Sequence, residues 1–326
     1  MTPRPIIIDC DPGQDDAVAL FLAMSSPDEL DLLGITAVGG NVPLALTERN
    51  ARIMCDIAAR QDVPVFAGCG VPLVRAPITA EYIHGETGIN GIDVFDPVTQ
   101  LQDIFAVDFI IEMLFAAVKS KVTLVATGPL TNIAAVLGRS PDIAERIAEI
   151  VIMGGAMREG GNRTPSAEFN IMADPHAADV VLSSGVPITM MGLDVTHQVL
   201  STEARVARIR ALNNPVADAT AGMLSFFHRY DTQKYSSNWT PLHDPCTVAF
   251  LLRPDLFKTK LCNVSVERES ELTIGHTAVD FWHVTDKPKN VNWAYDVDAD
   301  GFYDLLTERL ARFLDYPRAT PDSKPR

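Results

Sequence analysis

The chain has few basic residues for its number of acidic ones, and it lacks the cysteine patterns and long apolar runs that define several protein classes. Its 27 lysines and arginines stand against 42 aspartates and glutamates, which gives a formal net charge of −15. Such a charge argues against nucleic acid or an anionic membrane surface as a partner. We expect cations and neutral polar small molecules instead.

The five cysteines are odd in number and scattered, with no C-x-x-C spacing. This argues against a disulfide framework or a zinc site and favours a reducing compartment. No apolar run reaches the roughly 18 residues of a membrane span. Residues 1–5 lead into a three-residue apolar strand, which is too short for the core of a signal peptide. We therefore expect a cytoplasmic protein with no membrane partner.

What the sequence does contain is an alternation of short apolar runs and helical patterns through its first 190 residues. The expected strands are 6–8, 32–38, 63–67, 122–126, 150–153 and 188–191, and the expected helices lie near 15–25, 44–60, 104–118, 129–138 and 174–184. The strands are nearly all apolar, as expected when helices cover both faces of a sheet. The pattern predicts an α/β fold with an open, mostly parallel, Rossmann-like sheet flanked by helices.

The pattern changes after residue 200, where it becomes more helical. Strand character returns near 263–267, 272–284 and 291–297, and a last helix is expected at about 301–314. This predicts a helical insertion and a small antiparallel region in the C-terminal part. No linker or repeat is visible, so we expect a single domain at 1–316 and a polar tail at 317–326.

Four carboxylates fall within eight residues where the first strand turns into the first helix: Asp9, Asp11, Asp15 and Asp16. Open α/β sheets bind ligands at the carboxyl ends of their strands, and carboxylates this close repel one another unless a cation or a proton neutralises them. The helix dipole alone would explain one or two acids, but not four. Because all the candidate ligands are oxygens, the pattern favours Ca²⁺ or Mg²⁺ over Zn²⁺.

Other strands end in polar or glycine-rich turns, at 39–41, 127–129 and 154–155. In a parallel sheet these turns lie on the same edge as the acids. A second carboxylate source is Asp244, which precedes Pro245 and could be a simple helix N-cap or a ligand. His243 stands beside it, at a helix N-terminus where an imidazole can serve as an acid or a base.

Two polar loops and one aromatic segment could complete a site. Loop 160–170 carries amides, hydroxyls and a carboxylate, which suit a ligand rich in hydroxyls, although an ordinary loop satisfying its own backbone has the same composition. Loop 84–91 could close as a lid, with His84 either in the site or on the surface. Tyr230, Tyr235 and Trp239 could stack on a base or simply pack the insertion.

Together these motifs resemble the nucleoside hydrolases, the inosine–uridine-preferring nucleoside N-ribohydrolases, from residue 6 to about residue 314. The opening D-x-D-P-G-x-D-D at Asp9 carries the resemblance most specifically. It is joined by the motifs at 39–41, 84–86, 127–132, 153–155, 168–170 and 243–245. Within the family the sequence is most similar to those of bacterial pyrimidine-preferring ribonucleoside hydrolases, notably at 241–247 and 287–290.

The resemblance implies one Ca²⁺ held by Asp11, Asp16, the backbone carbonyl of Thr127 and Asp244. Asp11 would be the general base that takes a proton from a metal-bound water, and Asp9 would support the turn. The ribose contacts implied are Asp15, Asn41, Glu168 and Asn170, helped by Asn162 and the Met153 backbone, and His84 and His243 would face the leaving base. Phe169, Tyr230 and Tyr235 complete the expected substrate-binding residues. The family also suggests a homodimer or homotetramer.

The expected activity is Ca²⁺-dependent hydrolysis of the N-glycosidic bond of ribonucleosides, with pyrimidine nucleosides such as uridine and cytidine favoured. Negative charge beside the ribose ring suits the oxocarbenium-like transition state, and direct attack by water implies inversion. His243 is the candidate acid for the leaving base. A purine-preferring or broad-specificity hydrolase, a catalytically inactive Ca²⁺-dependent nucleoside-binding protein, and an aspartyl-nucleophile phosphatase remain alternatives; the last lacks its expected lysine.

Overall fold

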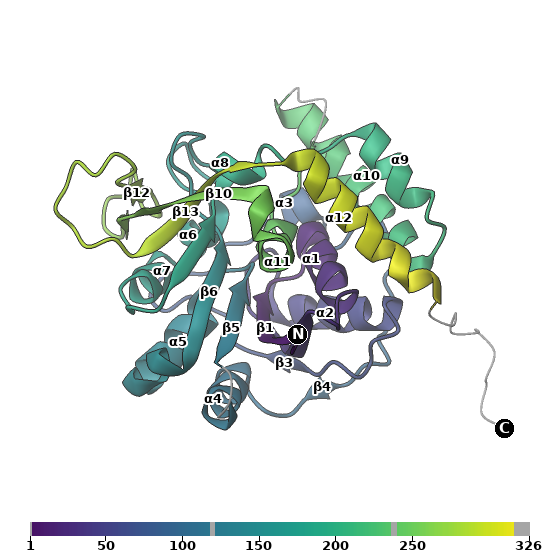
Figure 1. Ribbon diagram of the computed structural model, residues 1–326, viewed down its shortest axis with the longest axis horizontal. Coiled ribbons are helices and arrows are strands. Elements are labelled where there is room, and N and C mark those ends of the chain that lie inside the picture. The colour runs from purple at the N-terminus through teal and green to yellow at the C-terminus, as the bar shows by residue number, and fades with distance from the viewer. Residues whose placement is uncertain (1, 118–120, 236–239, 316–326) are drawn as a thin grey trace.

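A mixed nine-stranded sheet forms the centre of the molecule. The computed structural model describes residues 2–117, 121–235 and 240–315, and the side chains of 141, 229–235 and 314–315 lie outside that description. The strand order is β10-β13-β7-β6-β5-β1-β2-β3-β4 (Figure 1). From β13 to β4 each neighbouring pair is parallel, and β10 runs antiparallel to β13 at one edge.

The expected mostly parallel α/β sheet is therefore confirmed. Its strands are β1 (Arg4–Cys10), β2 (Leu30–Ala37), β3 (Val65–Ala67), β4 (Leu101–Gln102), β5 (Val122–Ala126), β6 (Ile147–Met153), β7 (Ile188–Met191), β10 (Phe257–Cys262) and β13 (Val291–Val297). The sequence pattern missed β10 because three of its side chains, including Lys258, are exposed, so the strand has no continuous apolar run. The expected strand at 272–284 is much shorter: β12 (Thr277–Val279) pairs antiparallel with β11 (Val264–Val266) in a separate hairpin.

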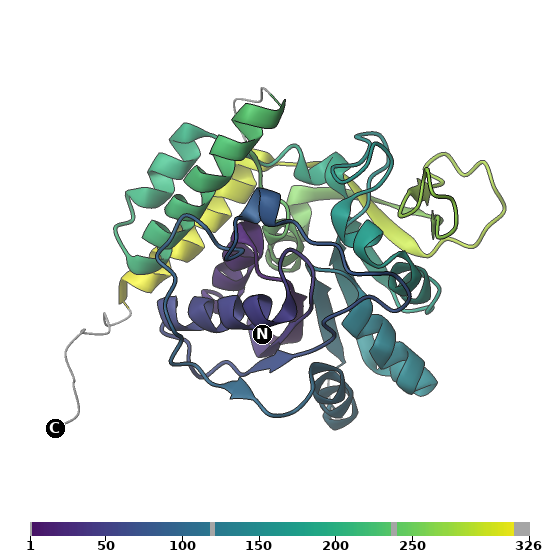
Figure 2. The same ribbon diagram turned by 180° about the vertical axis from the view of Figure 1, so that it is seen from behind.

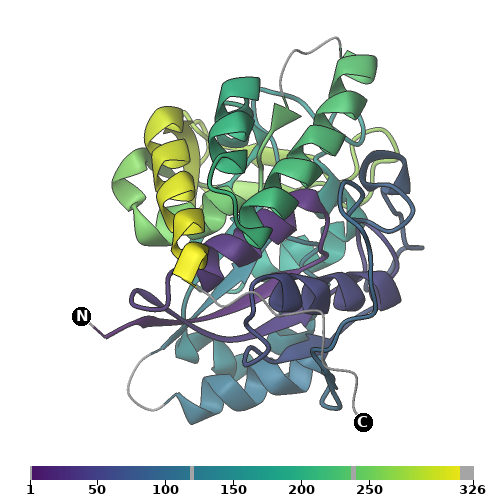
Figure 3. The same cartoon turned by 90° about the vertical axis from the view of Figure 1, so that its right-hand side faces the viewer.

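Both faces of the sheet are buried under helices. In β1, Ile6 and Ile8 belong to one hydrophobic core and Ile7 to the other, as the alternation of side chains along a strand requires. The first core includes α1 (Gln14–Met24), α2 (Leu44–Ile57), α11 (Pro245–Leu252) and α12 (Ala299–Ala311), and the second includes α4 (Ala106–Ala116), α5 (Thr131–Arg139) and α7 (Pro175–Leu182). Figure 3 shows the strands between these two layers.

Helix α1 occupies the middle of the first layer. All eleven of its residues are buried, as expected for a helix that is apolar nearly all the way round. It packs against α11, α10 and α12. Asp15 and Asp16, in its first turn, are consequently held at the edge of the sheet by packed structure.

The helical insertion predicted after residue 200 consists of α9 (Glu203–Arg210) and α10 (Pro215–Tyr235). Two short strands, β8 (Leu200–Ser201) and β9 (Thr240–Pro241), pair antiparallel and join its ends. The insertion stacks with α12 on one side of the molecule (Figures 1 and 2). The chain therefore returns from α10 to the sheet edge just before His243 and Asp244.

The remaining helices are short: α3 (Glu81–His84), α6 (Phe169–Ala173), α8 (Leu193–Thr196), and the 3₁₀ turns Pro141–Arg146, Pro254–Leu256 and Arg312–Asp315. The final turn follows α12, so the last helix begins and ends slightly earlier than predicted. Within the described ranges, no helix combines the length and the apolar character needed to cross a membrane.

Candidate active site

A cavity of about 510 Å³ opens at the carboxyl ends of the central strands. This size suits a small-molecule ligand. Eleven residues predicted from the sequence line it: Asp15, Asn41, His84, Thr127, Met153, Asn162, Glu168, Phe169, Asn170, His243 and Asp244. Asp11 and Asp16 lie directly beneath this lining. Tyr230 and Tyr235 belong to the part of α10 whose side chains are not described, and Trp239 lies outside the described residues.

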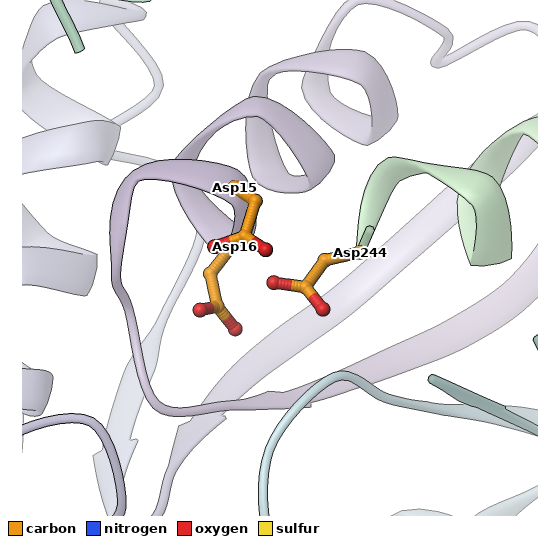
Figure 4. A group of neighbouring side chains, drawn as sticks. All are labelled: Asp15, Asp16 and Asp244. Atoms are coloured by element: carbon orange, nitrogen blue, oxygen red, sulfur yellow. The ribbon is translucent and has the colours of Figure 1, made fainter. Parts of the chain in front are cut away.

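Three carboxylates meet on the floor of the cavity. Asp15, Asp16 and Asp244 each offer an oxygen, and these oxygens lie within 4.8 Å of one another. Figure 4 shows Asp15 and Asp16 on the first turn of α1 and Asp244 at the start of α11, with their carboxylates facing one another. The residues are 6%, 0% and 3% exposed. The chain therefore brings together two acids that adjoin each other and a third more than two hundred residues away.

Asp244 stands at the N-cap position of α11, but its side chain makes no capping hydrogen bond. A capping role is therefore not what this carboxylate does in the folded chain. Asp16 differs, since its Oδ2 accepts the backbone N–H of Gly13 at 3.0 Å and thereby caps α1. Its Oδ1 accepts the hydroxyl of Thr127 at 2.7 Å. Helix capping therefore explains one of the two hydrogen bonds of Asp16, and it does not explain the position of the Asp244 carboxylate.

Asp11 is enclosed by backbone. Its Oδ2 accepts the N–H of Asn41 at 2.7 Å, whereas its buried Oδ1 has no hydrogen-bond partner among the described residues. A Cβ on Gly40 would lie 2.0 Å from Oδ2, and one on Gly128 would lie 2.6 Å from Oδ1. The turns that end β2 and β5 therefore need glycine so that they can close around this carboxylate.

Burial raises the pKa of Asp11, Asp15, Asp16 and Asp244, and neighbouring carboxylates raise those of Asp11, Asp15 and Asp244 further. The pKa of Asp15 rises to about 7, that of Asp16 rises, and those of Asp11 and Asp244 rise well above their ordinary value. Such a cluster stays ionised at neutral pH only beside a cation. The donor set consists of oxygens alone, and one oxygen each of Asp11 and Asp15 has no hydrogen-bond partner in the part of the chain that the structure describes; both features fit a hard ion such as Ca²⁺ or Mg²⁺.

Asp9 lies behind this cluster. One of its oxygens accepts the hydroxyl of Thr36 at 2.6 Å and the amide of Asn132 at 2.7 Å. The side chain of Asn132 also accepts the backbone N–H of Cys69 at 2.7 Å. Asp9 thus ties the first strand to β2 and α5, Asn132 extends this link to the segment after β3, and together they support the turn that presents Asp11.

The carboxylates make the stability of the metal-free protein depend on pH. Burial raises the pKa of Asp9 and Asp15 from 3.8 to about 7. Between these values the folded chain keeps protons that the unfolded chain has released, so these groups lower the free energy of unfolding as pH rises through that window. We expect Ca²⁺ to raise Tm more at about pH 7.5 than at about pH 5, because the cation competes with protons. Scanning calorimetry with Ca²⁺ or a chelator measures this, and equal increases at both pH values would contradict it.

The opposite wall of the cavity is built from loop 160–170. Glu168 caps α6, with Oε1 accepting the N–H of Asn170 at 2.9 Å and Oε2 accepting that of Gly155 at 3.0 Å. Asn162 accepts the N–H of Phe169 at 2.9 Å. The loop therefore does satisfy its own backbone, and the same contacts hold its carboxylate and amides against the cavity.

Asn170 connects this wall to the floor. Its Nδ2 donates to the carbonyl oxygen of Thr127 at 2.7 Å and to that of Met153 at 3.2 Å. Two strand ends, those of β5 and β6, are thereby fixed relative to α6. The Thr127 carbonyl retains a second lone pair beside the carboxylate cluster.

Three histidines line the cavity. Burial lowers the pKa of His84 to about 4, and burial together with the other two histidines lowers that of His243 to about 3, so both rings are neutral at pH 7. His243 Nδ1 lies 2.7 Å from the hydroxyl of Thr196. His197, whose ring is 5.7 Å from that of His243, has its Nδ1 3.0 Å from Glu159 Oε2.

His197 and Glu159 were missed by sequence reasoning, although both line the cavity. Both follow the carboxyl ends of parallel strands, and this is the criterion that identified the other site residues in the sequence. His197 follows α8, directly after the carboxyl end of β7, and Glu159 lies in the loop after β6. Phe227, from α10, also lines the cavity and places the helical insertion on its outer wall.

Comparison with known proteins gives a consistent picture. A profile of the family described as "Inosine-uridine preferring nucleoside hydrolase" matches residues 6–304. An uncharacterized protein of Schizosaccharomyces pombe is 50% identical over 307 residues, which covers 94% of this chain and 99% of that protein.

Two further relatives have more informative names. A protein named pyrimidine-specific ribonucleoside hydrolase RihA, of Photobacterium profundum, is 47% identical over 311 residues, covering 95% of this chain and 99% of its own. The solved structure of a purine-preferring ribonucleoside hydrolase from Gardnerella vaginalis superposes with a TM-score of 0.88 at 35% identity and covers 95% of this chain and 99% of its own.

Proposed function

The chain belongs to the inosine–uridine preferring nucleoside hydrolase family, and from that premise we propose that it hydrolyses pyrimidine ribonucleosides to ribose and free base with the help of one Ca²⁺. The observation that supports this most is the buried group of Asp15, Asp16 and Asp244 on the cavity floor with Asp11 beneath it. One oxygen each of Asp11 and Asp15 has no hydrogen-bond partner among the described residues. A cavity of about 510 Å³ above it has room for a nucleoside.

In this proposal Asp11, Asp16, the Thr127 carbonyl and Asp244 hold the cation. When bound, Ca²⁺ would anchor ribose hydroxyls and lower the pKa of a water at the site. Asp11 accepts the proton of the attacking water, for which its Oδ1 has no competing partner among the residues described. The water attacks the anomeric carbon directly, so the product forms with inversion.

The ribose lies between the floor and the wall. Asp15 and Asn41 bind hydroxyls from one side, and Glu168 and Asn170 bind them from the other, with Asn162 and the Met153 backbone beside them. All of these residues line the same cavity. The negative charge of Asp15 and Glu168 stabilises the oxocarbenium-like ring as the base departs.

His243 hydrogen-bonds the leaving base in this scheme. A Thr196 hydroxyl that donates to Nδ1 leaves the imidazole hydrogen on Nε2, and this N–H can donate a hydrogen bond to a carbonyl of the leaving base. Phe169 contributes apolar surface to the cavity. Tyr230 and Tyr235 remain candidates for base contacts by their position in the insertion.

The base preference is proposed from the relatives. The name of the 47% identical protein favours pyrimidines. The 35% identical structure is that of a purine-preferring hydrolase, which makes a purine-preferring or broad-specificity enzyme the second candidate. We also propose a cytoplasmic location and a homodimer or homotetramer.

A steady-state comparison of uridine, cytidine, inosine and adenosine tests the function. We expect kcat/KM to be at least about tenfold higher for the two pyrimidine nucleosides, a difference of about 1.4 kcal/mol in transition-state binding. A higher value for inosine would establish the second candidate. If no nucleoside is cleaved in the presence of Ca²⁺, the hydrolase proposal fails.

A further inference from the structure

His84 is held in place by a single side chain from the first turn of α1. Its Nδ1 lies 2.6 Å from the side-chain oxygen Oε1 of Gln14. The side-chain nitrogen of Gln14 donates to two backbone carbonyls, those of His84 at 3.0 Å and Asn90 at 3.1 Å. Both side chains are buried. Gln14 therefore ties the turn after β1 to the loop that carries His84.

Gly13 makes this contact possible. A Cβ at Gly13 would lie 2.5 Å from His84 Nδ1, far inside contact distance. Any other residue here would push the imidazole away from Gln14. The glycine next to the carboxylate cluster thus serves the histidine as well as the turn.

These contacts determine which nitrogen of His84 carries the proton. Backbone carbonyls only accept hydrogen bonds, so the two around Gln14 require its NH₂ group on their side. Turning the amide over would set its oxygen against both carbonyls. Oε1 must therefore face His84, and because an amide oxygen only accepts, Nδ1 of His84 must carry the hydrogen.

The other ring nitrogen of His84 is available to a ligand. Nε2 has no hydrogen-bond partner among the residues described, and His84 lines the cavity with its ring stacked 5.6 Å from that of Phe227. Burial lowers the pKa of His84 to about 4, so the ring is neutral at pH 7. A neutral imidazole with its hydrogen on Nδ1 presents a lone pair at Nε2.

Building on the proposed function, we propose that Gln14 is a positioning residue that fixes the Nδ1–H tautomer of His84, so that Nε2 accepts a hydrogen bond from a donor on the bound nucleoside. Two donors fit this chemistry: the ring N3–H of uracil and the 5′-hydroxyl of ribose. The 2′- and 3′-hydroxyls belong with the carboxylates of the floor. His84 in this tautomer cannot donate a proton to the leaving base, which leaves that step to another group.

The tautomer can be observed directly in the whole protein. In protein labelled with ¹⁵N-histidine, two-bond ¹H–¹⁵N correlation spectra distinguish protonated from unprotonated ring nitrogens, and His84→Phe assigns the signals. We expect a protonated Nδ1 and an unprotonated Nε2 at pH 7. The reverse pattern in wild-type protein overturns the proposal, whether or not any nucleoside is hydrolysed.

Gln14→Met tests the origin of the tautomer, because methionine has a similar length and makes no hydrogen bond. We expect the Nδ1–H signature of His84 to be lost or mixed with the other tautomer. Gln100→Met, at an exposed position, should leave the spectrum unchanged. An unchanged His84 signature in Gln14→Met removes Gln14 from the proposal, and if that variant does not fold, the wild-type spectrum decides.

Two uridine analogues identify the donor. 3-Methyluridine lacks the N3–H, and 5′-deoxyuridine lacks the 5′-hydroxyl. We expect one of them to lose about tenfold in kcat/KM with wild-type enzyme, as for the loss of one hydrogen bond, and to show no such loss relative to uridine in His84→Phe. Losses that persist in His84→Phe, or no loss with either analogue, contradict the recognition role while leaving nucleoside hydrolysis itself intact.

Discussion

Asp11→Asn is expected to lower kcat/KM for uridine by about 1,000-fold or more while the protein stays folded. The substitution removes the group that accepts the proton of the attacking water, and positioned general bases contribute roughly 100- to 10,000-fold. The fold should survive because an asparagine oxygen can still accept the N–H of Asn41, which Asp11 Oδ2 now accepts at 2.7 Å. Removing one charge from a crowded cluster also relieves repulsion.

Steady-state kinetics with uridine, together with a thermal melt, checks this expectation. Asp31→Asn is the matched control, since it makes the same chemical change at an exposed position of β2. The control should keep wild-type activity. Near-normal hydrolysis of uridine by Asp11→Asn would remove Asp11 from the role of general base, and an unfolded variant would show that the carboxylate is needed for the turn.

Asp244→Asn is expected to weaken metal binding by more than about 100-fold and to abolish turnover at ordinary Ca²⁺ concentrations. Substituting a residue that only hydrogen-bonds to a metal ligand typically lowers metal affinity by roughly 10- to 100-fold. Asp244 belongs to the group of carboxylates itself, so its loss should have a larger effect. Helix α11 should persist, because the Asp244 side chain makes no capping bond. Its backbone carbonyl, which accepts the hydroxyl of Thr247 at 2.6 Å, is unaffected.

Elemental analysis of the dialysed protein measures the metal content of this variant. Asp286→Asn, at an exposed position, is the control and should bind as much Ca²⁺ as wild type. Partial recovery of activity at high Ca²⁺ would support a role in binding. A full complement of tightly bound Ca²⁺ in Asp244→Asn would show that this residue is not a ligand.

Part of the cavity floor could be predicted from the sequence because its residues directly follow recognisable strands. Asp11, Asn41 and Thr127 each follow an apolar strand, and parallel strands place their carboxyl ends together. The identity of the strands was readable from their apolar runs. The strand order of the sheet then places the ends of β1, β2 and β5 beside one another.

Other features were out of reach because they depend on packing between distant segments. Whether Asp244 caps its helix or faces the other acids is decided by where α11 meets α1. The Gln14 contact with His84 joins residues seventy positions apart. Neither segment has a sequence pattern that predicts this contact. Strand β10 was missed since its exposed face gives it no apolar run.

The β8–β9 ladder separates the insertion that forms one wall of the cavity from the carboxylates on the cavity floor. The ladder joins the two ends of the α9–α10 excursion, and Val199 accepts the N–H of Leu242 at 2.9 Å just beyond it. The excursion is therefore closed at its base, so a residue of α10 that faces the cavity, such as Phe227, can change without displacing Asp244. Selection can reshape the wall that carries Phe227 while the metal-binding floor stays fixed, so new substrate ranges can arise by evolution of one loop.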